Sequence, residues 1–332
     1  MSLTQLLNIS EVKQALAENF RRPAFPQVTP NLVAPSQAQD PSLAGIAFDY
    51  LFRSEIYDRL RLNSRKYFGR SIDADWFGVL PMTTPSELDS KHSLRVIDFV
   101  PIAGFGLRML NNSAAVSDAL KNQANAVYDT VTQAEIRNSY VSDEKLTLWE
   151  RTENYLRLAK FDQVYRAGYV HDDFEKNNQD NTEDMLKIFQ NVNFDRFTPH
   201  ICCLLNPSLK AVGSFGGADA DLVFDDVLID LKTSTEFKLT SRDLNQLIGY
   251  LVLSRLGGFS GAKNTPQIRR LGIYFARYAY LYTFSVDELT TEDNLNTFCK
   301  WFKKSFSCKS VGNLARPLAR SLTIPMINLS SK

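Results

Sequence analysis

The chain has 332 residues, of which 44% are hydrophobic and 23% are charged, a composition that excludes a fibrous or disordered protein. This length can bury a large core, in one elaborated domain or in two. The formal net charge of +1 excludes a global attraction to nucleic acid, so any such attraction must be local.

The N-terminal third contains two predicted helices and a proline-rich stretch. Residues 2–20 predict a short helix with apolar positions at Leu6, Val12 and Leu16. Residues 21–43 contain repeated prolines and predict a loop or an extended arm along the body. A second helix is expected over residues 45–61, with an apolar stripe at Phe48, Phe52 and Ile56.

The middle of the chain predicts an irregular stretch followed by helices. Residues 63–111 contain several prolines and glycines and are expected to be irregular. Residues 113–140 and 142–166 have helical patterns, and a shorter helix is expected at residues 183–192. The solvated carboxylates expected on these helices include Glu150 and Glu153.

The most informative stretch is residues 216–250, which predict a hairpin followed by a helix. Two apolar runs, residues 220–224 and 227–232, are separated by Asp225 and Asp226 and predict two strands. Side chains alternate faces along a strand, so Asp230 and Lys232 share a face. If the strands pair, Asp221 joins them at one end of the sheet.

A carboxylate pair beside an apolar layer needs a counter-charge. Lys232 and a divalent cation together would supply it. Mg²⁺ prefers hard oxygen ligands, here the carboxylates of Asp221 and Asp230 and the carbonyl of Leu231.

A helix and a further strand follow the hairpin. The helix is expected at residues 242–256, where Arg242, Gln246 and Tyr250 share one face. The strand is expected within residues 268–284 and contains Arg277, which either reaches a phosphate or is a surface residue. The order strand, strand, helix, strand indicates an α/β core.

These residues resemble a known family of nucleases. Asp221, eight intervening residues and then Asp230-Leu231-Lys232 resemble the PD-(D/E)XK motif, and Gln246 to Tyr250 resembles the QxxxY motif of the RecB-like exonuclease branch. Ala220 replaces the proline of the motif, a residue that carries no chemistry. The resemblance covers residues 207–284.

The resemblance implies a fold, an activity and a cofactor. The fold is a restriction-endonuclease-like core, a central mixed sheet flanked by helices, with a helical insertion. The activity is hydrolysis of DNA that leaves a 5′-phosphate, with Mg²⁺ or Mn²⁺ as cofactor, in DNA repair or in defence against phage and foreign DNA. Asp221, Asp230 and Lys232 would be catalytic, and Gln246 and Tyr250 would contact the substrate, with Arg277 as a further candidate. QxxxY favours an exonuclease over an endonuclease.

The resemblance also implies a metal ligand on the first helix of the core. Asp49 occupies the place where the branch commonly has histidine, and Glu55, Glu150 and Glu153 are alternatives. A structural interpretation of Asp49 is an ion pair with Arg53 at (i, i+4).

The expected organisation follows from these assignments. Residues 1–44 form an N-terminal helix and arm, residues 45–62 and 142–290 the nuclease-like core, residues 63–141 a mostly helical insertion, and residues 291–332 a basic segment. Residues 294–332 contain no acidic residue, and aromatic side chains alternate with lysines. They predict a phosphate-contacting edge, or an amphipathic helix whose aromatics enter the core.

The remaining expectations concern cofactors, partners and location. No apolar run approaches membrane-spanning length and no secretory leader is evident, so we expect a cytoplasmic protein that does not bind membranes. The cysteines are expected to be reduced thiols, with no iron–sulfur cluster, because Cys202 and Cys203 are adjacent and Cys299 and Cys308 lie far apart. DNA is the expected partner, and other protein partners or self-association remain open.

Two other functions are compatible with the sequence. One is a nuclease-fold protein that binds nucleic acid without cleaving it. The other is a nucleotidyltransferase, because Gly213-Ser214 and Asp219-Ala220-Asp221 resemble a GS…DxD signature; the spacing between its halves is too short, and it leaves Lys232, Gln246 and Tyr250 unexplained.

Overall fold

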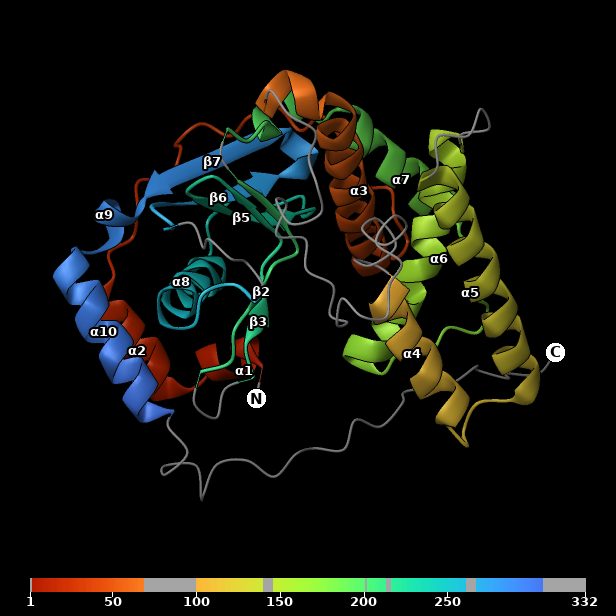
Figure 1. The fold of residues 1–332 in the computed structure, drawn as a ribbon, viewed down its shortest axis with the longest axis horizontal. Helices are drawn as coiled ribbons and strands as arrows, with labels where there is room; N and C mark the ends of the chain where they lie inside the picture. The colour runs from red at the N-terminus through yellow and green to blue at the C-terminus, as the bar shows by residue number, and fades with distance from the viewer. Residues whose placement is uncertain are drawn as a thin grey trace. The chain divides into compact units, whose positions relative to one another are not determined.

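The structure is a computed structural model that describes residues 2–68, 100–139, 146–200, 202–212, 216–260 and 267–306 (Figure 1). Its contacts divide the chain into two compact units. The described parts of residues 1–33, 58–80 and 192–317 form one, which we call the sheet unit. Those of residues 34–57 and 81–191 form the other, the helical unit.

The sheet unit contains a five-stranded mixed sheet within the described residues. Its strands are β1 (Cys203–Leu205), β4 (Leu222–Phe224), β5 (Val227–Lys232), β6 (Arg270–Phe275) and β7 (Tyr280–Ser285), in that spatial order. Neighbouring strands are antiparallel except β5 and β6, which are parallel. The expected α/β class, a central mixed sheet flanked by helices, is confirmed.

Helix α8 (Ser241–Leu256) makes the crossover that parallel strands β5 and β6 require. It begins with a capping box in which Thr240 and Asp243 satisfy each other's backbone N–H groups. Its apolar side chains, such as Leu247 and Leu251, join Leu228 and Ile273 of the sheet in one core. The helix expected at residues 242–256 is therefore confirmed.

Three further helices lie on the side of α8 opposite the sheet (Figure 1). They are α1 (Leu3–Leu7), α2 (Ser10–Asn19) and α10 (Glu292–Ser305). Residues 2–20 thus form two short helices rather than one, although the expected apolar positions Leu6, Val12 and Leu16 are all buried. Short connecting elements complete this unit: η3 (Phe194–Phe197), η4 (Ala276–Tyr278) and α9 (Val286–Leu289).

The expected hairpin is present, but its first strand is shorter than predicted. Strand β5 coincides with the predicted residues 227–232, whereas β4 begins at Leu222. Just before it, β3 (Ala218–Asp219) pairs with β2 (Ser208–Leu209) in a separate two-stranded sheet. The chain therefore pairs with β2 up to Asp219 and with β1 and β5 from Leu222 onwards, so Asp219 is not part of the main sheet.

The proline-rich arm contains no helix or strand from residue 21 to residue 40, as expected. The Arg21 N–H donates to the Leu289 carbonyl, and the Phe25 ring packs against Phe237, Phe275 and Tyr282. The arm is thus fixed to the sheet unit as far as Val33, whose N–H donates to the Arg277 carbonyl.

Helix α10 confirms the amphipathic-helix interpretation of the basic segment up to residue 306. Phe298 and Phe302 are buried, and the Phe298 ring lies 4.9 Å from that of Phe20. Lys300 and Lys303 are exposed on the other side. These two phenylalanines form core contacts instead of an exposed stacking surface.

The helical unit consists of the described residues of α3 (Pro41–Phe68) up to residue 57, with α4 (Val100–Asn112), α5 (Asp118–Ser139), α6 (Leu148–Ala167) and α7 (Gln179–Gln190). The expected stripe of Phe48, Phe52 and Ile56 is buried. Helix α4 was not expected, because its proline and glycines disfavour a helix locally. In the described ranges no helix is long and apolar enough to cross a membrane.

The contacts group the chain differently from the expected organisation. From the sequence, residues 45–62 and 142–290 were expected to form one core. In the structure most of α3, together with α6 and α7, belongs to the helical unit, whereas the sheet belongs to the other unit.

Helix α4 contacts α6 at Gly106, where there is no room for a larger residue. A Cβ at this position would lie 2.0 Å from the carbonyl oxygen of Phe161 in α6. We predict that Gly106→Ala lowers the free energy of unfolding by about 2 kcal/mol or more, because two backbones must separate. Gly104→Ala, whose Cβ would meet only the end of the Tyr128 side chain, is the control and should be neutral or stabilising. Equal effects of both variants in urea denaturation would contradict this packing.

His171 should make the stability of the helical unit depend on pH. Burial, followed by the nearby charge of Lys160, lowers the pKa of His171 to about 4, and its Nε2 lies 2.6 Å from Oε1 of Gln163. Between about pH 6.5 and pH 4 the unfolded chain binds this proton and the folded chain does not. Stability should therefore fall as the pH decreases through this window, by about 3 kcal/mol in all.

The variant His171→Gln isolates this contribution. Urea denaturation at a series of pH values should show a flatter pH dependence for His171→Gln than for the wild type. The substitution of the exposed His200 by Gln should keep the wild-type slope. An unchanged slope for His171→Gln would refute the assignment.

Candidate active site

The candidate site lies where β4 and β5 pair, on the face of the sheet that α8 covers. The register pairs Leu222 with Ile229, so the next step places Asp221 opposite Asp230. Directly opposed residues of an antiparallel pair share a face. The Leu231 N–H donates to Oδ2 of Asp221 at 2.7 Å, which fixes this carboxylate beside the strand.

Asp230 is the buried centre of the site, with 2% of its surface exposed. Its Oδ2 lies 2.8 Å from Nζ of Lys232, and its Oδ1 accepts a hydrogen bond of 3.2 Å from Nε2 of Gln246. Lys232 also lies 3.4 Å from Oδ1 of Asp243 at the start of α8. The structure therefore brings Asp221, Asp230 and Lys232 together on one face, as the hairpin predicted.

The charge state of Lys232 follows from these neighbours. Burial acts to lower its pKa, but the charges of Asp230, Asp243 and Asp221 and the hydrogen bond to Asp230 outweigh burial and raise it. Lys232 is consequently an ammonium ion at neutral pH. It can donate a hydrogen bond or stabilise negative charge, and it cannot act as a general base.

Helix α8 contributes Gln246 and Tyr250 to the same site. Nε2 of Gln246 donates to the Tyr250 hydroxyl at 2.7 Å as well as to Asp230. Burial, followed by the charges of Asp221 and Asp230, raises the pKa of Tyr250 well above its usual value. The phenol therefore stays neutral. The two residues expected from the QxxxY motif lie beside the carboxylates.

Arg277 is enclosed in the sheet unit, next to the end of β5. Only 1% of its surface is exposed, and its Nε donates to the Thr233 carbonyl. It also lies in η4, between β6 and β7, and not in a strand. Neither expectation for Arg277, contact with a phosphate or a place on the surface of a strand, agrees with this position.

Asp49 belongs to the helical unit, and its carboxylate is engaged there. Its oxygens accept hydrogen bonds from Nε and Nη2 of Arg53, at 2.9 and 2.6 Å. The (i, i+4) ion pair that the sequence offered as the structural interpretation is therefore present. This geometry does not support the expectation that Asp49 completes a metal site with Asp221 and Asp230.

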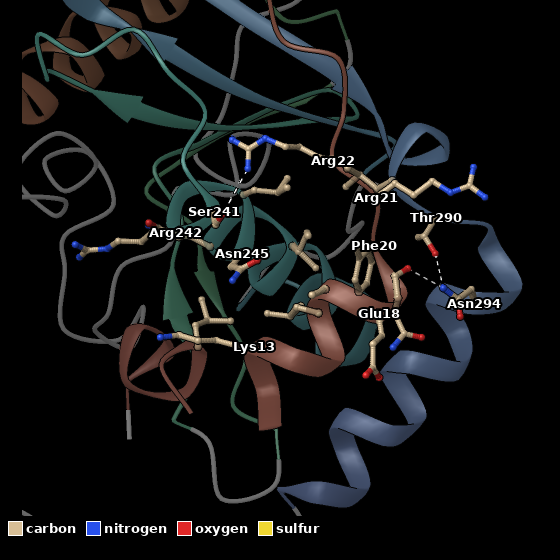
Figure 2. A pocket seen from close by; sticks show the side chains of 18 of the residues that line it. Lys13, Glu18, Phe20, Arg21, Arg22, Ser241, Arg242, Asn245, Thr290 and Asn294 are labelled. Carbon is tan, nitrogen blue, oxygen red and sulfur yellow. Dashed lines mark hydrogen bonds between the residues drawn. The ribbon is translucent and has the colours of Figure 1, made fainter. Parts of the chain in front are cut away.

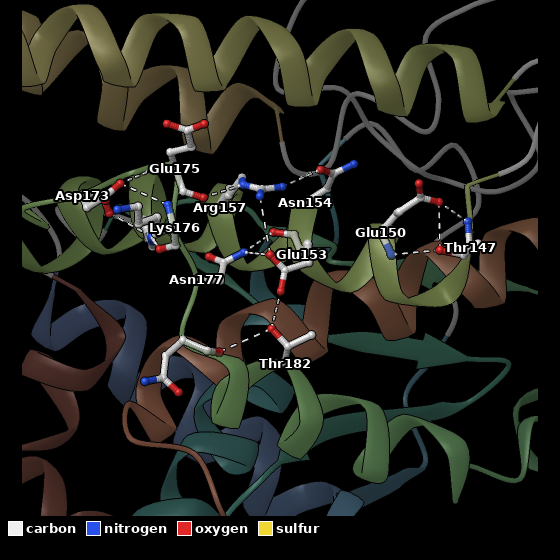
Figure 3. A network of polar contacts seen from close by, with 12 residues as sticks. Thr147, Glu150, Glu153, Asn154, Arg157, Asp173, Glu175, Lys176, Asn177 and Thr182 are labelled. Atoms are coloured by element: carbon white, nitrogen blue, oxygen red, sulfur yellow. Dashed lines mark hydrogen bonds and ion pairs between the residues drawn. The ribbon is translucent and has the colours of Figure 1, made fainter.

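The alternative helix carboxylates also have structural partners in the helical unit, and Figure 3 shows those of Glu150 and Glu153. Glu55 lies 3.3 Å from Arg151, and Glu150 caps its own helix through Thr147. Glu153 accepts hydrogen bonds from Thr182 and Asn177. These carboxylates stabilise helix ends and helix–helix contacts within the helical unit.

The donor set suits a hard divalent cation. The described residues contain no group of three or more histidine, cysteine, aspartate or glutamate side chains that could hold a metal. Mg²⁺ commonly binds through one or two carboxylates and completes its shell with water and substrate phosphates. Asp221, Asp230 and the Leu231 carbonyl match that preference.

Asp243 is a site residue that the sequence analysis missed. It pairs with Lys232 and caps α8 at the same time, since its side chain accepts a hydrogen bond from the Thr240 backbone. The pattern of Thr240 followed three residues later by an acidic residue is a helix-start signature that could have drawn attention to it.

The nucleotidyltransferase alternative rests on two pairs of residues, of which only the aspartates belong to the described part of the chain. Gly213 and Ser214 lie outside the described residues. Asp219 lies in the small β2–β3 sheet and accepts a hydrogen bond of 2.7 Å from the Ser208 hydroxyl. Asp219 is part of β3, whereas Asp221 lies just before β4, so this arrangement does not favour the alternative.

The described cysteines are free thiols. Cys203 and Cys299 are buried and Cys202 is partly buried, while Cys308 lies outside the described residues. Burial raises the pKa of the Cys202 and Cys299 thiols to about 11, so they are protonated and unreactive at neutral pH.

Comparison of the chain with protein-family models, with curated proteins and with solved structures found no match.

The charge pair in the site leads to a prediction about stability. Lys232→Ala leaves Asp230 buried without its ammonium partner, and we expect the free energy of unfolding in EDTA to fall by about 2 kcal/mol. Mg²⁺ should recover part of the loss, because a bound cation supplies the missing charge. Lys238→Ala, which removes an exposed ion pair with Glu236, is the control and should have little effect. Equal Mg²⁺ responses in Lys232→Ala and Asp230→Asn would argue against cation binding here.

Proposed function

We propose that this protein is a metal-dependent deoxyribonuclease of the PD-(D/E)XK type, acting in the cytoplasm. The observation that carries the proposal is the convergence of Asp221, Asp230 and Lys232 at one end of the β4–β5 hairpin, with Lys232 2.8 Å from Asp230. Two carboxylates and a lysine at this spacing suit phosphodiester hydrolysis.

The arrangement of the sheet and α8 adds support. The hairpin that carries the two aspartates leads directly into α8, which returns to the parallel strand β6. Gln246 of α8 donates hydrogen bonds to Asp230 and to the hydroxyl of Tyr250, one turn further along the helix. The residues of the two resembled motifs thus lie next to one another, which supports the exonuclease-like branch.

Each residue has a role in the proposed reaction. Asp221, Asp230 and the Leu231 carbonyl would hold a divalent cation, which lowers the pKa of a bound water and offsets charge at the scissile phosphate. Lys232, protonated at neutral pH, would orient the attacking water or stabilise the charge that develops on the phosphate oxygens. Gln246 holds Asp230 and Tyr250 in register for the substrate.

One observation favours a second candidate, a nuclease-fold subunit that binds nucleic acid without cleaving it. The helix carboxylate that the branch would use, at Asp49, is engaged by Arg53. Cleavage assays separate this candidate from the nuclease.

Asp230→Asn and Lys232→Ala should abolish cleavage while the protein stays folded. The assay incubates linear and covalently closed circular DNA with Mg²⁺, Mn²⁺ or EDTA, and far-UV circular dichroism checks the fold. We expect a loss of ~10²-fold or more in rate for each variant, since each removes a charge that acts at the reacting phosphate. Lys238→Ala should cleave as the wild type does.

The substrate form identifies the type of nuclease. Metal-dependent loss of linear DNA alone indicates an exonuclease, whereas cutting of the circle indicates an endonuclease. Cleavage that survives both Asp230→Asn and Lys232→Ala would refute the assignment. Binding without cleavage in the wild type would favour the silent subunit.

A further inference from the structure

A cavity of about 1130 Å³ opens in the sheet unit between α2, the first turns of α8 and residues 287–294 (Figure 2). Its lining includes an apolar set: Leu7, Leu16, Phe20, Leu244, Ile248 and Leu289. The basic residues among its lining are Lys13, Arg21, Arg22 and Arg242, and the acidic ones are Glu18 and Asp287. The cavity therefore combines apolar walls with an excess of positive charge.

The basic side chains of this cavity are placed to bind an anion. Lys13, Arg22 and Arg242 are exposed, and none of the ion pairs found among the described residues involves them. Arg22 extends over the start of α8, where its Nη1 lies 3.4 Å from the Ser241 hydroxyl (Figure 2). Four basic residues against two acidic ones leave an excess of positive charge in the lining, which an anionic ligand offsets.

The polar groups between these cations add hydrogen-bonding capacity. Asn245 lies on α8 between Arg242 and Gln246 and lines the cavity with its side-chain amide. An amide offers both donors and an acceptor, as the edge of a nucleobase requires. An apolar wall suits the face of the base, and the cations suit its phosphate.

Gln246 connects the cavity to the candidate active site. It lines the cavity, and its Nε2 donates to Oδ1 of Asp230. A ligand held in the cavity consequently lies one side chain away from the carboxylates. Bases can reach an apolar wall only when they are unpaired, as in a single strand. At about 1130 Å³ the cavity also exceeds the usual size of a small-molecule site.

We propose that this cavity, the α2–α8 cavity, binds a single-stranded stretch of nucleic acid, with phosphates on Lys13, Arg22 and Arg242 and bases against the apolar wall. The bound strand continues past Gln246 to Asp230. The proposal rests on the proposed function in making this strand the substrate, but the binding itself requires no cleavage. The protein thus prefers single-stranded ends or gaps over intact duplex.

Binding is measured by fluorescence anisotropy in EDTA, which prevents metal-dependent cleavage. The probe is a labelled oligothymidylate of about 12 nucleotides, titrated with the full chain at several salt concentrations. The variant Arg22→Gln/Arg242→Gln removes two of the cations. The matched control Arg196→Gln/Arg269→Gln removes two exposed arginines of the same unit that do not line the cavity.

We expect the cavity variant to bind about tenfold more weakly or worse, and its salt dependence (log K against log salt) to fall by about 1.4, or 0.7 for each phosphate contact. The control should bind as the wild type does. Equal losses in both variants would show a general charge effect, and no loss in the cavity variant would place the strand elsewhere; either result overturns the proposal.

Further probes test the role of the bases. An abasic strand of equal length and a duplex should both bind about tenfold more weakly than the single strand. A mononucleotide or an acidic peptide that binds as tightly as the strand would overturn the proposal in favour of a small anion or a generic polyanion.

The proposal and the nuclease function fail in different ways. If cleavage depends on Asp230 but the cavity variant binds like the wild type, only the cavity assignment is wrong. If the cavity variant loses binding while the wild type cleaves no DNA with any metal, the cavity assignment stands and the nuclease function is wrong.

Discussion

The burial of the Asp230 carboxylate is the interaction on which the sheet unit depends. With 2% of its surface exposed, the charge of Asp230 must be compensated locally. Lys232 from the same strand and Gln246 from α8 provide the compensation. The contact with Lys232 lies within β5, whereas Gln246 connects β5 to α8. Together with the ion pair between Lys232 and Asp243, the hydrogen bond from Gln246 ties the start of α8 to the end of β5.

This constraint divides α8 into two faces. Leu247, Leu251 and Val252 join the common core of the sheet and the outer helices. Asp243 and Gln246 face charged groups of β5. An apolar core excludes water from one side of the polar cluster, so the attraction between Lys232 and its carboxylates is stronger than on an open surface. The raised pKa of Lys232 reflects this.

The sequence pattern was sufficient to predict those helices and strands that depend mainly on their own residues. The apolar run of β5 and the helical spacing of α8 were both predicted with bounds within one residue. The start of β4 was missed because β3 pairs with β2 instead, a choice made by residues outside the hairpin. Helix α4 was missed because its glycines disfavour a helix locally, while close packing on α6 at Gly106 favours it.

In the candidate site, too, some residues could be predicted from the sequence and others could not. Asp221, Asp230 and Lys232 could be found from spacing, because two paired strands bring them together. Asp243 could not be linked to Lys232 without knowing how α8 returns over β5. The burial of Arg277 could not be predicted from the sequence, because it depends on the Thr233 carbonyl and on the arm at Val33.

The N-terminal elements acquire a role that no motif suggested. Helix α2 and the arm after it bring Lys13 and Arg22 to the opening above α8, although more than two hundred residues separate Arg22 from Ser241 in sequence. Gln246 lies at the boundary, in the lining of the cavity and in contact with Asp230. Helix α8 supplies Gln246 to the candidate active site and Arg242 to the cavity, so the position of this helix affects both. Helix α8 therefore joins the candidate active site to the cavity at which we propose that an anionic strand binds.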